Sequence, residues 1–136
     1  MVFHVIKFGR THLEDATPLT VGQEWSGYTT QLNDSLDNIK QSMKNLYKLA
    51  AGGTTVGTGL NSPPDFGMKV AAKIALLTKH PFTSAPNKFA AQASLDGMVN
   101  TIAALRGLAV ALMKFANDVI RWLACGPRAG TKHTIQ

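Results

Sequence analysis

The chain has 136 residues, of which 45% are hydrophobic and 16% are charged. This length and composition fit one folded domain and argue against a disordered chain. Fourteen Lys and Arg residues against eight Asp and Glu residues give a formal net charge of +6, a balance that favours anionic partners without identifying one. Cys125 is the single cysteine, which excludes an internal disulfide and a zinc site built from cysteines.

The N-terminal segment and the most apolar stretch were compared with targeting and membrane sequences. Residues 1–8 form too short an apolar run for a signal peptide. The most apolar stretch, residues 98–120, contains Arg106, Lys114 and Asp118, which a membrane helix does not readily tolerate. We therefore expect a soluble chain with no membrane partner.

The first predicted element is a long helix over residues 17–51, preceded by a loop over residues 1–16. Thr17-Pro18 indicates its start, because a hydroxyl cap followed by proline is typical of a helix N-terminus. Gly52-Gly53 indicates its end. Apolar residues recur every seven positions along it and form a stripe of coiled-coil type: Trp25, Leu32, Ile39 and Leu46, accompanied by Tyr28, Leu36 and Met43.

A loop rich in Gly and Pro over residues 52–64, a short helix over residues 65–79 and a second long helix over residues 94–125 follow. The last helix is apolar on more sides than one antiparallel neighbour can cover. Each long helix spans about 45 Å, whereas a compact domain of this length is about 37 Å across. No strand-like alternation of any length is recognised. We therefore expect an all-α fold of long antiparallel helices that completes its core as a dimer or tetramer.

Two patterns that suggest ligand sites have simpler structural explanations. The glycine-rich stretch at residues 52–59 lacks the Lys-Ser/Thr pair of a phosphate-binding loop, so a turn between helices is the better interpretation. Its hydroxyl and amide groups could still bind a small anion. Lys40, Lys44 and Lys48 are spaced four residues apart and could follow a nucleic-acid backbone. Without interleaved aromatic residues they indicate a solvated helix face, and we expect no nucleic-acid partner.

The stretch "GRTHLEDATP", residues 9–18, is the best candidate for chemistry. His12 can exchange a proton near neutral pH, and Arg10 could attract a carboxylate substrate. A single histidine in a loop is more often ordinary than catalytic. His4, His80 and His133 have no sequence neighbours that suggest a role in chemistry.

Several stretches together resemble the class II fumarases of the fumarase/aspartase superfamily. The resemblance covers residues 7–130 in the family's order, and the carriers are GRTHLEDATPLTVGQE at residues 9–24, GGTTVGTGLN at residues 52–61, APNKF at residues 85–89 and LMKFAND at residues 112–118. His12 and the APNKF run favour fumarase, because aspartases carry Gln at the histidine position.

This resemblance implies reversible hydration of fumarate to L-malate, a step of the tricarboxylic acid cycle, without metal or organic cofactor. It implies that His12 accepts or donates the proton of the water or hydroxyl group. It also implies that Thr11 contacts the substrate carboxylate. It also implies a tetramer with a central helical bundle, sites built from several subunits, and a location in the cytoplasm or the mitochondrial matrix.

The departures from the family limit what the chain can do alone. Neither the family's upstream Ser-Ser-Asn motif nor its downstream Gly-Ser-Ser-x-Met-Pro-x-Lys-x-Asn loop, which supplies the serine base, occurs in these residues. We therefore expect a fragment of the central helical domain that is inactive by itself. Glu14 replaces the usual Gln, and the extra residue at Val119-Ile120 predicts a π-bulge or a final turn rotated by about 100°. The alternative function is a non-catalytic helical oligomer or interaction module.

Overall fold

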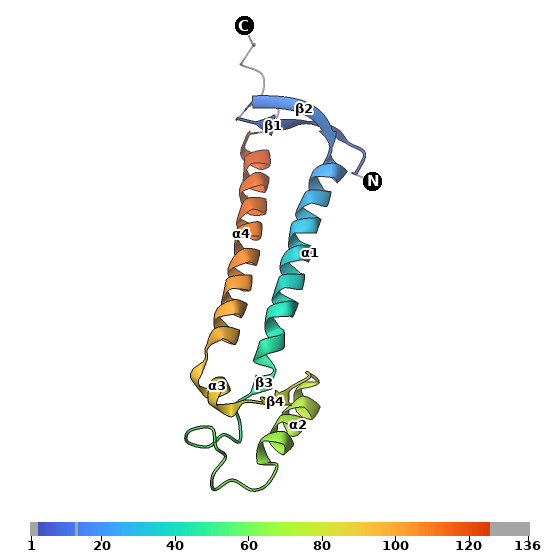
Figure 1. Ribbon diagram of the computed structural model, residues 1–136. Coiled ribbons are helices and arrows are strands. Elements are labelled where there is room, and N and C mark those ends of the chain that lie inside the picture. Colours follow the sequence, from blue (N-terminus) through green and yellow to red (C-terminus); the bar gives the residue numbers. More distant parts are fainter. Residues whose placement is uncertain (1–2, 13, 126–136) are drawn as a thin grey trace. The chain divides into compact units, whose positions relative to one another are not determined.

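The computed structural model describes residues 3–12 and 14–125, without the side chains of residues 122–125. Two compact units are distinguished: a hairpin unit, Met1–Leu36 with Arg106–Gln136, and a loop unit, Asp37–Leu105. The elements in chain order (Figure 1) are β1 (Ile6–Thr11), β2 (Glu14–Thr20), α1 (Val21–Leu46), β3 (Lys48–Leu49), α2 (Phe66–Thr78), β4 (Thr83–Ser84), α3 (Lys88–Ala93) and α4 (Asp96–Cys125).

The hairpin unit begins with two β-strands, which corrects the expectation of an all-α fold with a loop over residues 1–16. β1 and β2 pair in antiparallel fashion, with Ile6 opposite Thr20 and Thr11 opposite Glu14. The chain is thus predominantly helical but not all-α.

A shift of register interrupts the hairpin between Phe8 and Arg10. Gly9 lies at this shift, and a Cβ atom there would come within 3.0 Å of the Thr17 carbonyl oxygen. Pro18 lies in β2 opposite Phe8, which a two-stranded hairpin tolerates because both of its strands are edges. Gly9 and Pro18 interrupt the alternation of apolar and polar residues, so the sequence pattern does not indicate these strands.

Helix α1 begins at Val21, four residues later than predicted, because Thr17-Pro18 belongs to β2. Thr20 and Gln23 form a capping box: the Thr20 amide donates to Gln23 Oε1 at 2.9 Å, and the Gln23 amide donates to Thr20 Oγ1 at 3.1 Å. The helix ends at Leu46, earlier than the predicted glycine pair, because the chain then enters β3.

The loop unit contains a short parallel pair of strands, with Lys48 of β3 opposite Thr83 of β4. Helix α2 covers Phe66–Thr78, within the predicted residues 65–79, and its flanking residues Asp65 and Lys79 both have φ of 60°. The left-handed conformation at Lys79 ends the helix, with its amide donating to the Ala75 carbonyl.

The predicted helix over residues 94–125 corresponds to α4, which begins two residues later than predicted, and the short helix α3 before it was not predicted. The break between α3 and α4 falls at residues 94–95, where Ser94 Oγ accepts a hydrogen bond from the Asp96 amide at 3.2 Å. α4 is α-helical throughout Asp96–Cys125, including Val119-Ile120. The prediction of a π-bulge is therefore wrong, and the extra residue continues the α-helix. The predicted rotation of the final turn concerns Trp122, whose side chain lies outside the described residues.

Helix α4 leaves much of its apolar surface uncovered. Its exposed large side chains are Met98, Val99, Ile102, Leu105, Val110, Leu112, Met113 and Ile120. The segment Asp96–Arg121 is also long and apolar enough to cross a membrane, with a mean hydropathy of 1.4, a criterion that core helices of soluble proteins meet as well. An antiparallel bundle and the absence of a membrane partner both stay predictions.

Candidate active site

The turn of the hairpin carries both residues that the motif selects, Thr11 and His12. Since Thr11 pairs with Glu14, the strands are connected by two residues, of which the structure describes His12. His12 has φ of 52°, the left-handed conformation that such two-residue turns favour and that His adopts more readily than most residues. The side chains of Thr11 and His12 are exposed, and neither makes a hydrogen bond or ion pair within residues 3–12 and 14–125.

The strands next to this turn are joined by an ion pair between Arg10 and Asp15. Arg10 Nε lies 3.3 Å from Asp15 Oδ1, and the side chains are 38% and 36% exposed. One of the five guanidinium N–H groups is used in this contact, and the others can still donate to an anion. The expectation that Arg10 attracts a carboxylate is thus sterically open and stays a prediction.

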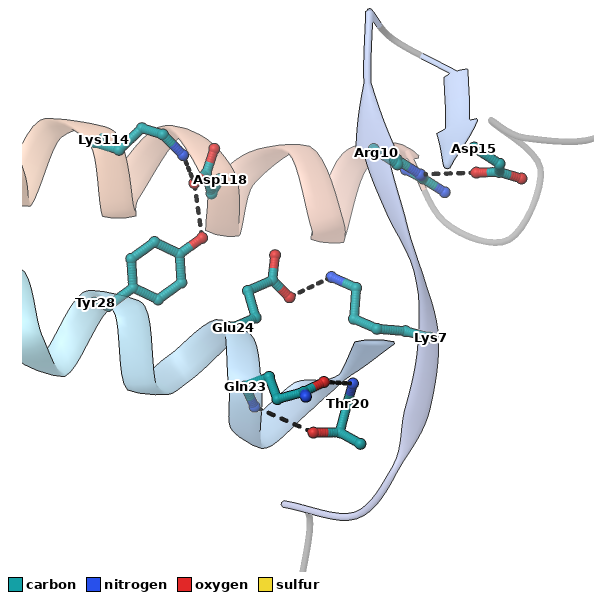
Figure 2. Close-up of polar contacts among 9 residues, drawn as sticks. All are labelled: Lys7, Arg10, Asp15, Thr20, Gln23, Glu24, Tyr28, Lys114 and Asp118. Atoms are coloured by element: carbon teal, nitrogen blue, oxygen red, sulfur yellow. Dashed lines mark hydrogen bonds and ion pairs between the residues drawn. The ribbon is translucent and has the colours of Figure 1, made fainter. Parts of the chain in front are cut away.

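The base of the hairpin is linked to α1 by Lys7 and Glu24. Lys7 Nζ lies 2.5 Å from Glu24 Oε2, and Figure 2 shows the two side chains directed toward each other from β1 and the first turn of α1. Sequence analysis did not identify this pair, because the partners lie seventeen residues apart across an unrecognised strand.

A second polar contact joins α1 to α4 within the hairpin unit. The Tyr28 hydroxyl donates to Asp118 Oδ2 at 2.7 Å, and Lys114 also pairs with Asp118 (Figure 2). The Tyr28 ring packs against Trp25 and Phe115, with centroids 6.2 and 5.2 Å away. The sequence placed Tyr28 on the apolar stripe, but its partner ninety residues away has no local signal.

The protonation states of this contact are well defined. Burial, the hydrogen bond to Asp118 and the charges of Asp118 and Glu24 raise the pKa of Tyr28, so its hydroxyl keeps its proton and acts as a donor. Burial alone would raise the pKa of Asp118, but hydrogen bonds from Lys114 and Tyr28 and the charges of Lys114 and Arg121 lower it. Near neutral pH the contact therefore joins a neutral phenol and a carboxylate.

The other histidines lie outside the hairpin turn or outside the described residues. His80 stacks on Tyr47 in the loop unit, with ring centroids 5.9 Å apart and planes inclined by 17°. His4 is exposed, and His133 lies outside the described residues. Within the part of the chain that the structure describes, no three His, Cys, Asp or Glu side chains are grouped so as to hold a metal ion.

The glycine-rich stretch forms a loop, as interpreted, whereas the lysine row is not one helix face: Lys40 and Lys44 lie exposed on α1, and Lys48 lies in β3. The Gly53 carbonyl accepts from the amides of Gly57 and Gly59 at 2.9 and 3.0 Å, so these two amides bond within the loop rather than to an anion. Lys40 pairs with Asp37 on an exposed part of α1.

Comparison with known proteins identifies the class of this chain. The profile of a family described as lyase matches residues 2–135. The chain therefore belongs to this lyase family.

Relatives with high sequence identity to this chain include fumarate hydratases. The chain is 67% identical over 131 residues to fumarate hydratase class II of Methanosarcina acetivorans, a match that covers 96% of this chain and 27% of the relative. It is 56% identical over 132 residues to the mitochondrial fumarate hydratase of Dictyostelium discoideum, with 97% and 27% covered. The resemblance to class II fumarases is confirmed, and the chain spans about a quarter of the length of these relatives.

Solved structures agree in fold. The crystal structure of recombinant class II fumarase from Schistosoma mansoni superposes with a TM-score of 0.83 at 39% identity, covering 93% of this chain and 29% of that one. A fumarate lyase:delta crystallin from Brucella melitensis, bound to cobalt, gives 0.80 at 30% identity, covering 92% and 27%. The helices and the hairpin thus belong to the fumarate lyase fold.

Proposed function

We propose that this chain supplies the Thr11-His12 part of a fumarate hydratase active site, which interconverts fumarate and L-malate in the tricarboxylic acid cycle. The observation that supports this function most strongly is the exposed Thr11-His12 turn in a chain 67% identical to a class II fumarate hydratase. The Thr11 hydroxyl lies at the last residue of β1 and the His12 imidazole directly after it, both exposed, where a substrate held by other segments can reach them.

The proposed chemistry divides between these two residues. In hydration, His12 takes a proton from the water that attacks one alkene carbon, and in the reverse direction it returns a proton to the leaving hydroxyl. Thr11 donates a hydrogen bond to a substrate carboxylate and stabilises charge that develops on it. The carbon-bound proton requires a second acid–base group, which other segments of an assembled enzyme must supply. No metal or organic cofactor enters these steps.

Assembly is part of the proposal. Burial of a large apolar side chain contributes roughly 1.5–3 kcal/mol, and α4 exposes several such side chains. A homo-oligomer, either a dimer or a tetramer with antiparallel long helices, would cover them. We propose the cytoplasm or the mitochondrial matrix as the compartment, in keeping with the mitochondrial relative from Dictyostelium discoideum.

A hybrid enzyme tests the function. Its sequence is that of the Methanosarcina acetivorans relative, with the 131 matched residues replaced by those of this chain. We expect the hybrid to form malate from fumarate in a coupled assay, and the 136-residue chain alone to remain at background. His12→Asn should lower kcat of the hybrid by at least ~10²-fold, the scale of one general acid–base group.

His4→Asn is the matched control, because His4 is also exposed in the N-terminal segment of the hairpin unit. It should leave the rate unchanged. An active hybrid that is indifferent to His12→Asn would contradict the catalytic role and favour the alternative, a non-catalytic helical oligomer.

A further inference from the structure

The β-hairpin needs support from the rest of the hairpin unit. A two-stranded hairpin is marginally stable by itself in water. Its apolar side chains Ile6 and Phe8 are 74% and 59% exposed, so they do not bury it against α1. β2 runs directly into α1 between Thr20 and Val21, so links between β1 and α1 give the hairpin a second attachment that can set its orientation.

Backbone hydrogen bonds provide the first link, ahead of the strand. The Gly22 amide donates to the Phe3 carbonyl at 3.1 Å, and the Val21 amide donates to the Val5 carbonyl at 2.9 Å. The approach is close, because a Cβ atom on Gly22 would lie 2.7 Å from the Phe3 carbonyl oxygen. These bonds fix where the chain meets α1, two residues ahead of Lys7 in β1.

The ion pair between Lys7 and Glu24 is the link that lies within β1. Its side chains are 26% and 22% exposed, against 62% and 66% for Lys40 and Asp37 on the same helix. A charge-assisted hydrogen bond of this kind is stronger when it is partly shielded from water, whereas an exposed pair contributes little. Glu24 also lies in the first turn of α1, where the helix dipole favours a carboxylate.

Because the ion pair lies far from the turn, a small rotation of β1 at the pair displaces His12 by a larger distance. His12 lies five positions after Lys7 in the chain, which at about 3.3 Å per position gives a lever of at most roughly 16 Å. A rotation of about 4° at the base would move the turn by about 1 Å over that length. A displacement of about 1 Å in a catalytic group can cost about 10²-fold in rate.

We infer that Lys7 and Glu24 are a positioning pair that sets the direction of the hairpin and thereby places Thr11 and His12 at the substrate. This inference rests on the proposed function, because it assigns the effect of the pair to the residues in the turn. In this inference Lys7 and Glu24 act through the turn and are not catalytic residues.

The experiment measures kcat and KM of the hybrid enzyme with Glu24→Gln and, separately, with Lys7→Met. We expect each change to lower kcat/KM by about 10- to 10²-fold while the thermal unfolding transition is preserved. Lys7→Arg keeps the charge and should retain the rate within about 3-fold. Asp37→Asn, which removes the exposed pair with Lys40, is the control and should change the rate by less than about 2-fold.

The same variants are then combined with His12→Asn. If the pair acts through the turn, Glu24→Gln and Lys7→Met should change the residual rate of the His12→Asn hybrid by less than about 3-fold. An equal loss with and without His12 would overturn the inference, and so would unfolding of either variant, since both outcomes assign the pair to stability alone.

Failure of this inference and failure of the proposed function give different results. If His12→Asn leaves the hybrid fully active, the proposed function fails, and the inference fails with it. If His12→Asn abolishes activity while Glu24→Gln and Lys7→Met retain it, only the positioning pair is wrong.

Discussion

The hairpin unit combines side-chain bonds between elements, Tyr28 to Asp118 and Lys7 to Glu24, with a close backbone approach at Gly22. In the loop unit, a close backbone approach lies between Gly52 and Gly67: a Cβ atom on Gly52 would lie 2.7 Å from the Cα of Gly67. The first unit can therefore be tested through its bonded side chains, and the second through its glycines.

This comparison predicts that the largest effect on stability comes from an aromatic side chain of the hairpin unit. Tyr28 is 8% exposed, and Tyr28→Ala removes both its ring contacts and its hydrogen bond. We expect a loss of about 3–5 kcal/mol in the free energy of unfolding, typical of large-to-small changes at aromatic core positions. Urea denaturation of the 136-residue chain, followed by circular dichroism, measures it.

Tyr28→Phe serves as the control, since it keeps the ring and removes only the hydroxyl. It should cost about 1–2 kcal/mol, the scale of one hydrogen bond. If Tyr28→Ala cost no more than Tyr28→Phe, the aromatic cluster would not hold the hairpin unit together.

A smaller effect distinguishes the two units by their glycines. A Cβ atom on Gly67 in the loop unit would lie 2.5 Å from the Ala51 carbonyl oxygen, whereas Gly107 in the hairpin unit has no such neighbour within 4 Å. Gly67→Ala should therefore destabilise the chain by about 1–3 kcal/mol through overpacking. Gly107→Ala should leave it unchanged or stabilise it by up to about 1 kcal/mol, because Ala is the better helix former.

Both glycine variants are compared in the same urea titration. Equal destabilisation by the two would show that the backbone contact in the loop unit has no special importance. A loss at Gly107 alone would indicate that α4 is closely packed by another chain at that point.

The smallest predicted effect is on pH dependence. Because the pKa of Asp118 is lower in the folded chain than its ordinary value of 3.8, its contribution to stability is present above that value and is lost as the pH falls through the folded pKa. Urea midpoints measured between about pH 2 and pH 7 should fall on the acid side. Asp118→Asn should reduce this fall, and an identical acid limb in both proteins would contradict the assignment.

The candidate site is local in the sequence, and the catalytic roles of its residues stay a proposal. The Thr-His motif identified Thr11 and His12, and the structure presents both on one exposed turn. The helix boundaries were less accurate, although a capping box at Thr20 and Gln23 was available and marks the true start of α1. Thr17-Pro18 imitates a helix start, and only pairing with β1 reveals that it belongs to a strand.

The features that the sequence did not predict, the β-hairpin and the bond between Tyr28 and Asp118, depend on contacts between residues that are not neighbours in the sequence. Phe8 and Ile6 alternate with Lys7, but their apolar side chains are exposed, so the short pattern does not mark a buried face. The partnership of Tyr28 with Asp118 spans ninety residues and arises only when α1 and α4 contact each other. No periodicity within either helix could specify it.

The most direct test of the central claim compares one histidine from each unit. In the hybrid enzyme, His12→Asn changes the exposed turn of the hairpin unit, and His80→Asn changes the ring stacked on Tyr47 in the loop unit. The measurement is kcat for malate formation by the two variants beside the unchanged hybrid. We expect a loss of at least ~10²-fold for His12→Asn and less than about 3-fold for His80→Asn. Full activity of the His12→Asn hybrid, or an equal loss in both variants, would contradict the account.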